Sequence, residues 1–357
     1  MESLINTKWL DLLSTHETPL LVKIKGSDYK DADAIVRGIK SGMLKNFLFL
    51  AIILTLFISC GATDEEEIED AIFNAQQLLT NGQCAEALEV LLKVPYQPSN
   101  ATYLKTLASG QACLGGYNTT VFFDSDLSKL GTSQTAFLGS LATFSTSNMT
   151  VTNSSNYQNI FNAIDTLTLA GGLTDASYAA RTAALGATKN NNISVFALYT
   201  ILVELGKFLN FYGNADDSTG IKGAGGLPNV CYFNYTNVTA VAAVSASSSG
   251  ACDHPGSTTG HTSLVLPANT DTRARACEGI VLFNNFIDII ANLTFSGSNS
   301  GDLNSLKSIT NTCTSIPGIT TETCTTKTVS SCISDTTNIT DVQFELYYSV
   351  IFENMHQ

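Results

Sequence analysis

The chain has 357 residues, with 31 acidic and 18 basic side chains and a formal net charge of −13 at neutral pH. After Cys60 the imbalance is 25 acidic against 11 basic side chains. This excludes a nucleic-acid-binding protein, because such proteins use Lys and Arg to neutralise phosphates. The roughly 300 residues after Cys60 can bury a sizeable core in one large domain or two small ones.

An apolar segment from Phe47 to Ile58 follows Met43-Leu44-Lys45-Asn46 and ends at Ser59-Cys60. As a helix this segment would span only about 18 Å, well short of the roughly 30 Å of hydrocarbon in a bilayer. We therefore expect a cleaved signal rather than a transmembrane anchor. The pattern resembles the signal peptide and lipobox of bacterial lipoproteins, in which a cysteine sulfur is lipidated.

This resemblance implies that Met43 is the natural start, that 1–42 is a non-native extension and that 43–59 is the signal peptide. Lipidated Cys60 and a tether would then occupy 60–67, which places the protein at the bacterial cell envelope, anchored in the membrane. By the same resemblance, Gly61 after the cysteine favours the outer membrane. Two alternatives remain open: a signal removed by the ordinary peptidase and a short uncleaved anchor, each with Cys60 an incidental thiol.

Eight cysteines follow Cys60, and an even number in an exported chain predicts disulfides. A long gap separates an N-terminal pair from a C-terminal set of six, and spacing alone leaves the pairing of the six open. The disulfide candidates are Cys84, Cys113, Cys231, Cys252, Cys277, Cys313, Cys324 and Cys332.

The first part of the body, 68–213, begins with apolar residues at helical spacing up to Leu79 and again from Cys84 to Leu92, with Asn81-Gly82 between them. This predicts an αα-hairpin. A third helix should follow Ser99 as N-cap and stop at Gly115-Gly116. The residues at 68–114 resemble one and a half tetratricopeptide repeats, although generic packing of a helical hairpin gives the same pattern.

Antiparallel packing of these helices would place Cys84 and Cys113 at similar depths. Cys84 lies about 15 Å along its helix from Val94, and Cys113 lies about 20 Å from Asn100. The sequence therefore predicts a disulfide between the two cysteines.

Further helices are expected at 157–170, 175–187 and 193–212, the last two separated by Asn190-Asn191-Asn192. The 193–212 helix is apolar nearly all round, so we expect it to be buried in the core rather than to cross a membrane. Its Glu204 and Lys207 have the i, i+3 spacing that permits pairing.

The second part, 214–357, begins with a long Gly/Ser/Thr-rich loop at 214–271. Helices follow at 279–295, 300–310 and 321–333, and an amphipathic helix at 340–353 has Val342, Leu346, Tyr347 and Val350 on one face. Together the pattern predicts an all-α fold, an irregular, loop-rich body of many helices cross-linked by disulfides.

Only weak patterns suggest a metal site. The stretch Asn214-Ala215-Asp216-Asp217-Ser218 resembles the opening of a calcium loop, with Asp216 among oxygen ligands at alternating positions, but the glycine and the distal glutamate of such a loop are missing. Asp253 and His254 lie next to Cys252, and with His261 and Asp271 they form the one His, Cys and carboxylate cluster of the sequence. The competing interpretation is a solvated turn and solvated loop histidines, and no cofactor is expected.

We expect a non-catalytic, membrane-tethered lipoprotein that binds a protein partner at the hairpin or organises the envelope. One alternative is a ligand-binding or metal-dependent envelope protein that uses the 214–271 loop. The other is a eukaryotic secreted glycoprotein, because the chain carries Asn-x-Ser/Thr sites such as Asn118, Asn148, Asn234 and Asn292.

Overall fold

The computed structural model describes most of the chain after residue 63. The described residues are 64–131, 137–146, 149–152, 154–216, 218–222, 231–236, 260–266, 272–293 and 310–353. The chain divides into two units, 1–70 and 71–357. Of the first unit only the start of α3 is described, and the contacts below lie within the second unit. Outside the described residues lie the predicted signal segment at 43–59, all but the last residue of the predicted helix at 300–310, and Cys60, Cys252, Asp253, His254 and Asp271.

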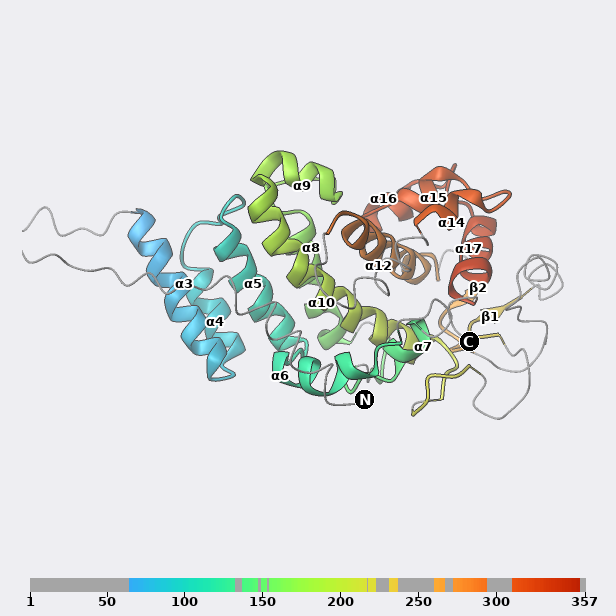
Figure 1. Ribbon diagram of the computed structural model, residues 1–357, viewed down its shortest axis with the longest axis horizontal. Helices are drawn as coiled ribbons and strands as arrows, with labels where there is room; N and C mark the ends of the chain where they lie inside the picture. The colour runs from blue at the N-terminus through green and yellow to red at the C-terminus, as the bar shows by residue number, and fades with distance from the viewer. Residues whose placement is uncertain are drawn as a thin grey trace, which may run out of the picture. The chain divides into compact units, whose positions relative to one another are not determined.

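The predicted hairpin is present as α3 (Asp64–Thr80) and α4 (Cys84–Leu91). Gly82 forms the turn between them with a φ of 74°, a conformation that favours glycine. α5 (Ala101–Leu114) follows, and its N-cap is Asn100, one residue later than predicted, because the Asn100 side chain accepts bonds from the first free amides of the helix. α4 packs on α5, and α5 packs on α8 (Figure 1).

The predicted disulfide between Cys84 and Cys113 is confirmed. It joins the first residue of α4 to the last turn of α5, with the two Cα atoms 5.7 Å apart. The two helices also approach closely at Gly110, where a Cβ atom would lie 2.6 Å from a methyl carbon of Leu88. A covalent link and a small residue therefore both hold α4 against α5.

The middle of the chain is helical, and α10 is its longest element. The elements are α6 (Thr119–Val121), η1 (Phe122–Asp126), η2 (Leu127–Lys129), α7 (Phe137–Ala142), α8 (Ser155–Thr168), α9 (Tyr178–Leu185) and α10 (Ala187–Tyr212). In the described part of the chain, α10 alone is long and apolar enough to cross a membrane, yet 78% of its most apolar window is buried in the protein. The prediction of a buried core helix is thereby confirmed.

The predicted break at the three asparagines is wrong. The chain turns instead at Gly186, with a φ of 82°, and α10 runs through the asparagines without interruption. Asn190 is buried, accepts a hydrogen bond from Nε of Arg181 at 3.1 Å and donates one to the hydroxyl of Thr182 at 2.7 Å. These bonds to α9 offset the weak helix propensity of asparagine.

The C-terminal part is built around α12. Its elements are β1 (Asn234–Tyr235), β2 (Val265–Leu266), α12 (Arg273–Asn292), α14 (Thr310–Ser315), α15 (Thr321–Thr325), α16 (Val329–Ser334), α17 (Asp341–Tyr347) and η3 (Tyr348–Phe352). α12 packs against α10 on one side and against α14, α15, α16 and α17 on the other (Figure 1). β1 and β2 form one short parallel pair.

The buried face of the last helix agrees with the predicted one only in part. Tyr347 is buried as predicted, but Val342 is 57% exposed, and the rest of the buried face includes Phe344, Tyr348 and Phe352. The α-helical turns of α17 continue as π-helical turns in η3. An α-helical spacing therefore does not predict which residues of η3 lie on the same face as the buried residues of α17.

Two further disulfides lie within the C-terminal part, Cys277–Cys332 and Cys313–Cys324. Cys231 is also disulfide-bonded. The prediction of an all-α, loop-rich body cross-linked by disulfides is therefore confirmed, with β1 and β2 as the strands that the described residues add to it.

Candidate functional site

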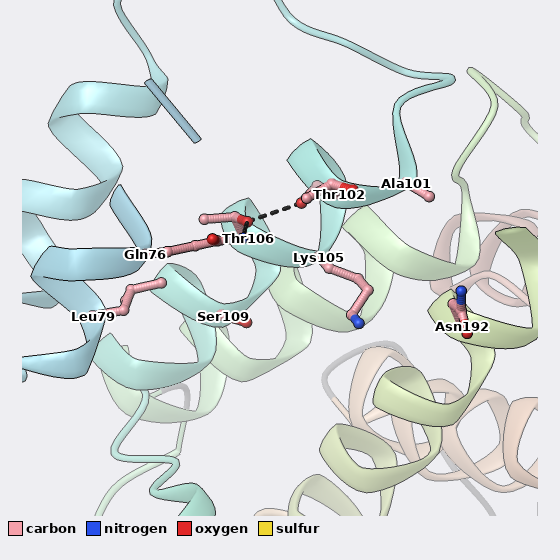
Figure 2. Close-up of a pocket in the computed structure, with 8 residues that line it drawn as sticks. All are labelled: Gln76, Leu79, Ala101, Thr102, Lys105, Thr106, Ser109 and Asn192. Atoms are coloured by element: carbon pink, nitrogen blue, oxygen red, sulfur yellow. Dashed lines mark hydrogen bonds between the residues drawn. The ribbon is translucent and has the colours of Figure 1, made fainter. Parts of the chain in front are cut away.

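A pocket of about 190 Å³ lies between α3, α5 and the start of α10, on the helical hairpin that the sequence suggested as a partner surface. Figure 2 shows that α5 supplies the floor, with α3 on one side and α10 on the other. The lining residues are Gln76, Leu79, Ala101, Thr102, Lys105, Thr106, Ser109 and Asn192.

α5 presents this face because its opposite face is buried. Tyr103, Leu104 and Ala108 are almost inaccessible to solvent, which leaves Thr102, Lys105 and Ser109 on the open side at i, i+3 and i+7. One position between the faces is polar and buried: Thr106 accepts a hydrogen bond from the amide of Gln76 at 3.2 Å. That bond fixes the floor of the pocket to α3.

The pocket is polar and carries one charge. Lys105 is exposed and is the single charged residue of the lining. Most of the other lining residues carry a hydroxyl or an amide group. Lining groups of these kinds can hydrogen-bond the backbone of a bound segment and attract an anionic group. The lining includes hydroxyl groups and the amine of Lys105, but no carboxylate, thiol or imidazole that could activate a hydroxyl.

Of the predicted metal-ligand candidates, Asp216 closes a turn. Its Oδ1 accepts bonds from the backbone amides of Ser218 at 3.0 Å and Thr219 at 2.8 Å and from the hydroxyls of both residues. These hydrogen bonds lower the pKa of Asp216 to about 2.

His261 stacks on Phe211, with ring centroids 4.4 Å apart, and its Nδ1 lies 2.6 Å from the hydroxyl of Ser263. Among the residues that the structure describes, no group of three or more His, Cys, Asp or Glu side chains could hold a metal ion. Asp216 and His261 are therefore not brought together with a third ligand there.

The core contains two buried carboxyl groups that the sequence did not predict. Glu204 of α10 is completely buried, and neither of its carboxyl oxygens has a hydrogen-bond partner within the described part of the chain. Glu278 of α12 is nearly buried and accepts a hydrogen bond from the Tyr157 hydroxyl at 3.1 Å. Glu204 stands out in the sequence as a charge inside an apolar helix. Its i, i+3 spacing suggested a pair with Lys207 of the same helix, and nothing in the spacing indicated a second acid from another helix.

Burial sets the protonation of both groups. It raises the pKa of Glu204 well above its ordinary value, with a further rise from Glu278 that opposes the lowering by Lys207. It also raises the pKa of Glu278 to about 7. Both carboxyls therefore hold their protons at a pH where solvated glutamates are ionised.

Comparison with protein-family models, with curated protein sequences and with solved structures finds no significant match for this chain.

Proposed function

We propose that the chain is an extracytoplasmic lipoprotein of the bacterial cell envelope, anchored through acyl chains on Cys60, and that its helical body binds a protein partner without catalysing a reaction. The proposal places it at the outer membrane, with 60–67 as the tether. α3 begins at Asp64, so the folded body would start four residues beyond the lipid.

The pairing of the cysteines carries this proposal. All seven described cysteines are disulfide-bonded, six of them with one another. Such a number of disulfides is typical of an oxidising, extracytoplasmic space and rare in a reducing cytosol. With nine cysteines in the chain, an odd one remains, and a thioether on Cys60 accounts for it.

The pocket on α3, α5 and α10 supports a binding role. A tetratricopeptide-like arrangement would present the open faces of α3 and α5 to an extended segment of a partner, and the polar lining suits hydrogen bonds to its backbone. Lys105 would meet an acidic group of that segment, because it is the charged side chain that the pocket offers.

Intact-mass analysis of the native protein from the membrane fraction tests the anchor. We expect a chain that begins at Cys60 and carries acyl chains, and we expect Cys60→Ala to leave the protein unlipidated. A mass that decreases after enzymatic deglycosylation, with no acyl adduct, would favour the secreted glycoprotein instead. A full-length cytosolic chain with free thiols would contradict both.

Cross-linking in intact cells tests the pocket. We expect one cross-linked partner to be lost in Lys105→Glu and retained in Lys189→Glu, which reverses the same charge at an exposed α10 position outside the pocket. Equal cross-linking in both variants would exclude the pocket as the contact surface while leaving the lipid anchor untouched.

A further inference from the structure

The junction between α10 and α12 places Glu204 and Glu278 in the interior, beside Tyr157 of α8. Tyr157 is fully buried, and its hydrogen bond to Glu278 joins α8 to α12. Because Glu204 has no hydrogen-bond partner among the described residues, its ionised form would be a buried charge with no donor to solvate it. Ionisation of this pair therefore acts directly on the packing of three core helices.

Burial outweighs the neighbouring groups that favour ionisation, which are Lys207 for Glu204, and Tyr157 and Arg275 for Glu278. Lys207, one turn along α10, is buried as well, and its ammonium makes no ion pair within 4 Å of the Glu204 carboxyl. The other groups electrostatically coupled to the acids are Arg275 of α12, Tyr212 of α10 and Tyr348 of η3. The described residues of α7 include no titratable side chain, and Arg181 of α9 binds Asn190, about four turns from Glu204 along α10.

The described disulfides leave this junction without a cross-link. Cys84–Cys113 joins α4 to α5 on the α10 side, whereas Cys277–Cys332 and Cys313–Cys324 lie among α12 and the helices that follow it. The packing of α10 on α12, and the hydrogen bond from Tyr157 of α8 to Glu278 of α12, therefore hold this junction without a described covalent link.

We propose that Glu204 and Glu278 form a pH-responsive joint that holds α8, α10 and α12 together while the two carboxyls are protonated and loosens the contact as they ionise. The acids bind more protons in the folded chain than in the unfolded one, so the joint is strongest below about pH 4.5 and weakens as the pH rises toward 7 and beyond. Burial lowers the pKa of Lys207, which acts in the opposite direction and limits the loosening at alkaline pH.

Chemical denaturation of the oxidised full chain, followed by circular dichroism at about pH 5 and about pH 8, tests this joint. We expect the unfolding equilibrium constant of the unsubstituted protein to be at least about tenfold larger at the higher pH. Glu204→Gln combined with Glu278→Gln should remove the part of that difference that the two acids contribute, whereas Asp165 of α8, whose pKa burial raises to about 6, keeps its own part. Glu86→Gln, an exposed carboxyl on α4, should leave it unchanged and controls for the loss of one negative charge.

If the double variant does not fold, hydrogen exchange of the unsubstituted protein still tests the joint. After correction for intrinsic exchange rates, protection in α10 and α12 should fall between the two pH values by about tenfold more than protection in α4 and α5. The proposal is overturned if protection falls equally in both regions. It is also overturned if the double variant folds and remains as sensitive to pH as the unsubstituted protein.

Discussion

The side chain of Lys222 pairs with that of Glu353, with Nζ 3.1 Å from Oε2, across 131 residues of sequence. Glu353 is completely buried, and its carboxylate also accepts hydrogen bonds from the backbone amides of Tyr232 and Phe233 and from the hydroxyl of Tyr235. Glu353 thus holds two loop segments, 218–222 and 231–236, against the core.

Replacing Glu353 with Gln should destabilise the protein by about 3 to 5 kcal/mol, because the change removes a completely buried carboxylate that pairs with Lys222 and accepts hydrogen bonds from two backbone amides. The amide nitrogen of the new side chain would also face backbone donors. Urea unfolding followed by circular dichroism measures the loss as a lower midpoint.

Asp341→Asn is the matched control. Asp341 pairs with Arg273 at 3.5 Å but is 57% exposed, so the loss should stay below about 1 kcal/mol. Equal losses in the two variants would mean that the Glu353 contacts do not hold the loops.

Local patterns predicted the helices and one disulfide well. The hairpin of α3 and α4 follows from apolar spacing and Gly82, and the Cys84–Cys113 bond follows from the depth of each cysteine along its helix. The sequence could not reveal the Glu353 contacts, because a carboxylate near a chain end looks solvated until its distant partners are known. The helix break predicted at Asn190 was wrong for the same reason, because the hydrogen-bond partners of Asn190 lie in another helix, α9.

Removal of the Cys84–Cys113 bond should lower stability by about 3 to 4 kcal/mol, because it closes a loop of about 30 residues in the unfolded chain. The double variant Cys84→Ser and Cys113→Ser, compared with the oxidised protein by urea unfolding, measures this loss. The corresponding change at Cys313 and Cys324, which closes a loop of about 12 residues, should cost roughly 1 kcal/mol less. A larger loss at the shorter loop would mean that packing at each site, and not loop length, decides the effect.

The natural protein should contain no tryptophan. Trp9 is the one tryptophan of the sequence, and it precedes both Met43 and Cys60. Purified native protein should therefore give tyrosine-type fluorescence, whereas the chain expressed from Met1 without processing should add tryptophan emission. Tryptophan emission from native protein would contradict a start at Met43 and removal of the signal.

The proposed lipid anchor predicts which cysteine forms a disulfide with Cys231. Six of the described cysteines pair with one another and Cys231 is disulfide-bonded, which leaves Cys60 and Cys252 as the cysteines of the sequence not yet assigned. A sulfur held in a thioether cannot form a disulfide, and lipidation of Cys60 therefore requires a Cys231–Cys252 bond. Non-reducing proteolysis with mass spectrometry should recover these two peptides linked, in the native protein and equally in Cys60→Ala. A peptide that links Cys60 to Cys231 in the native protein would refute lipidation directly, because the same sulfur cannot hold both bonds.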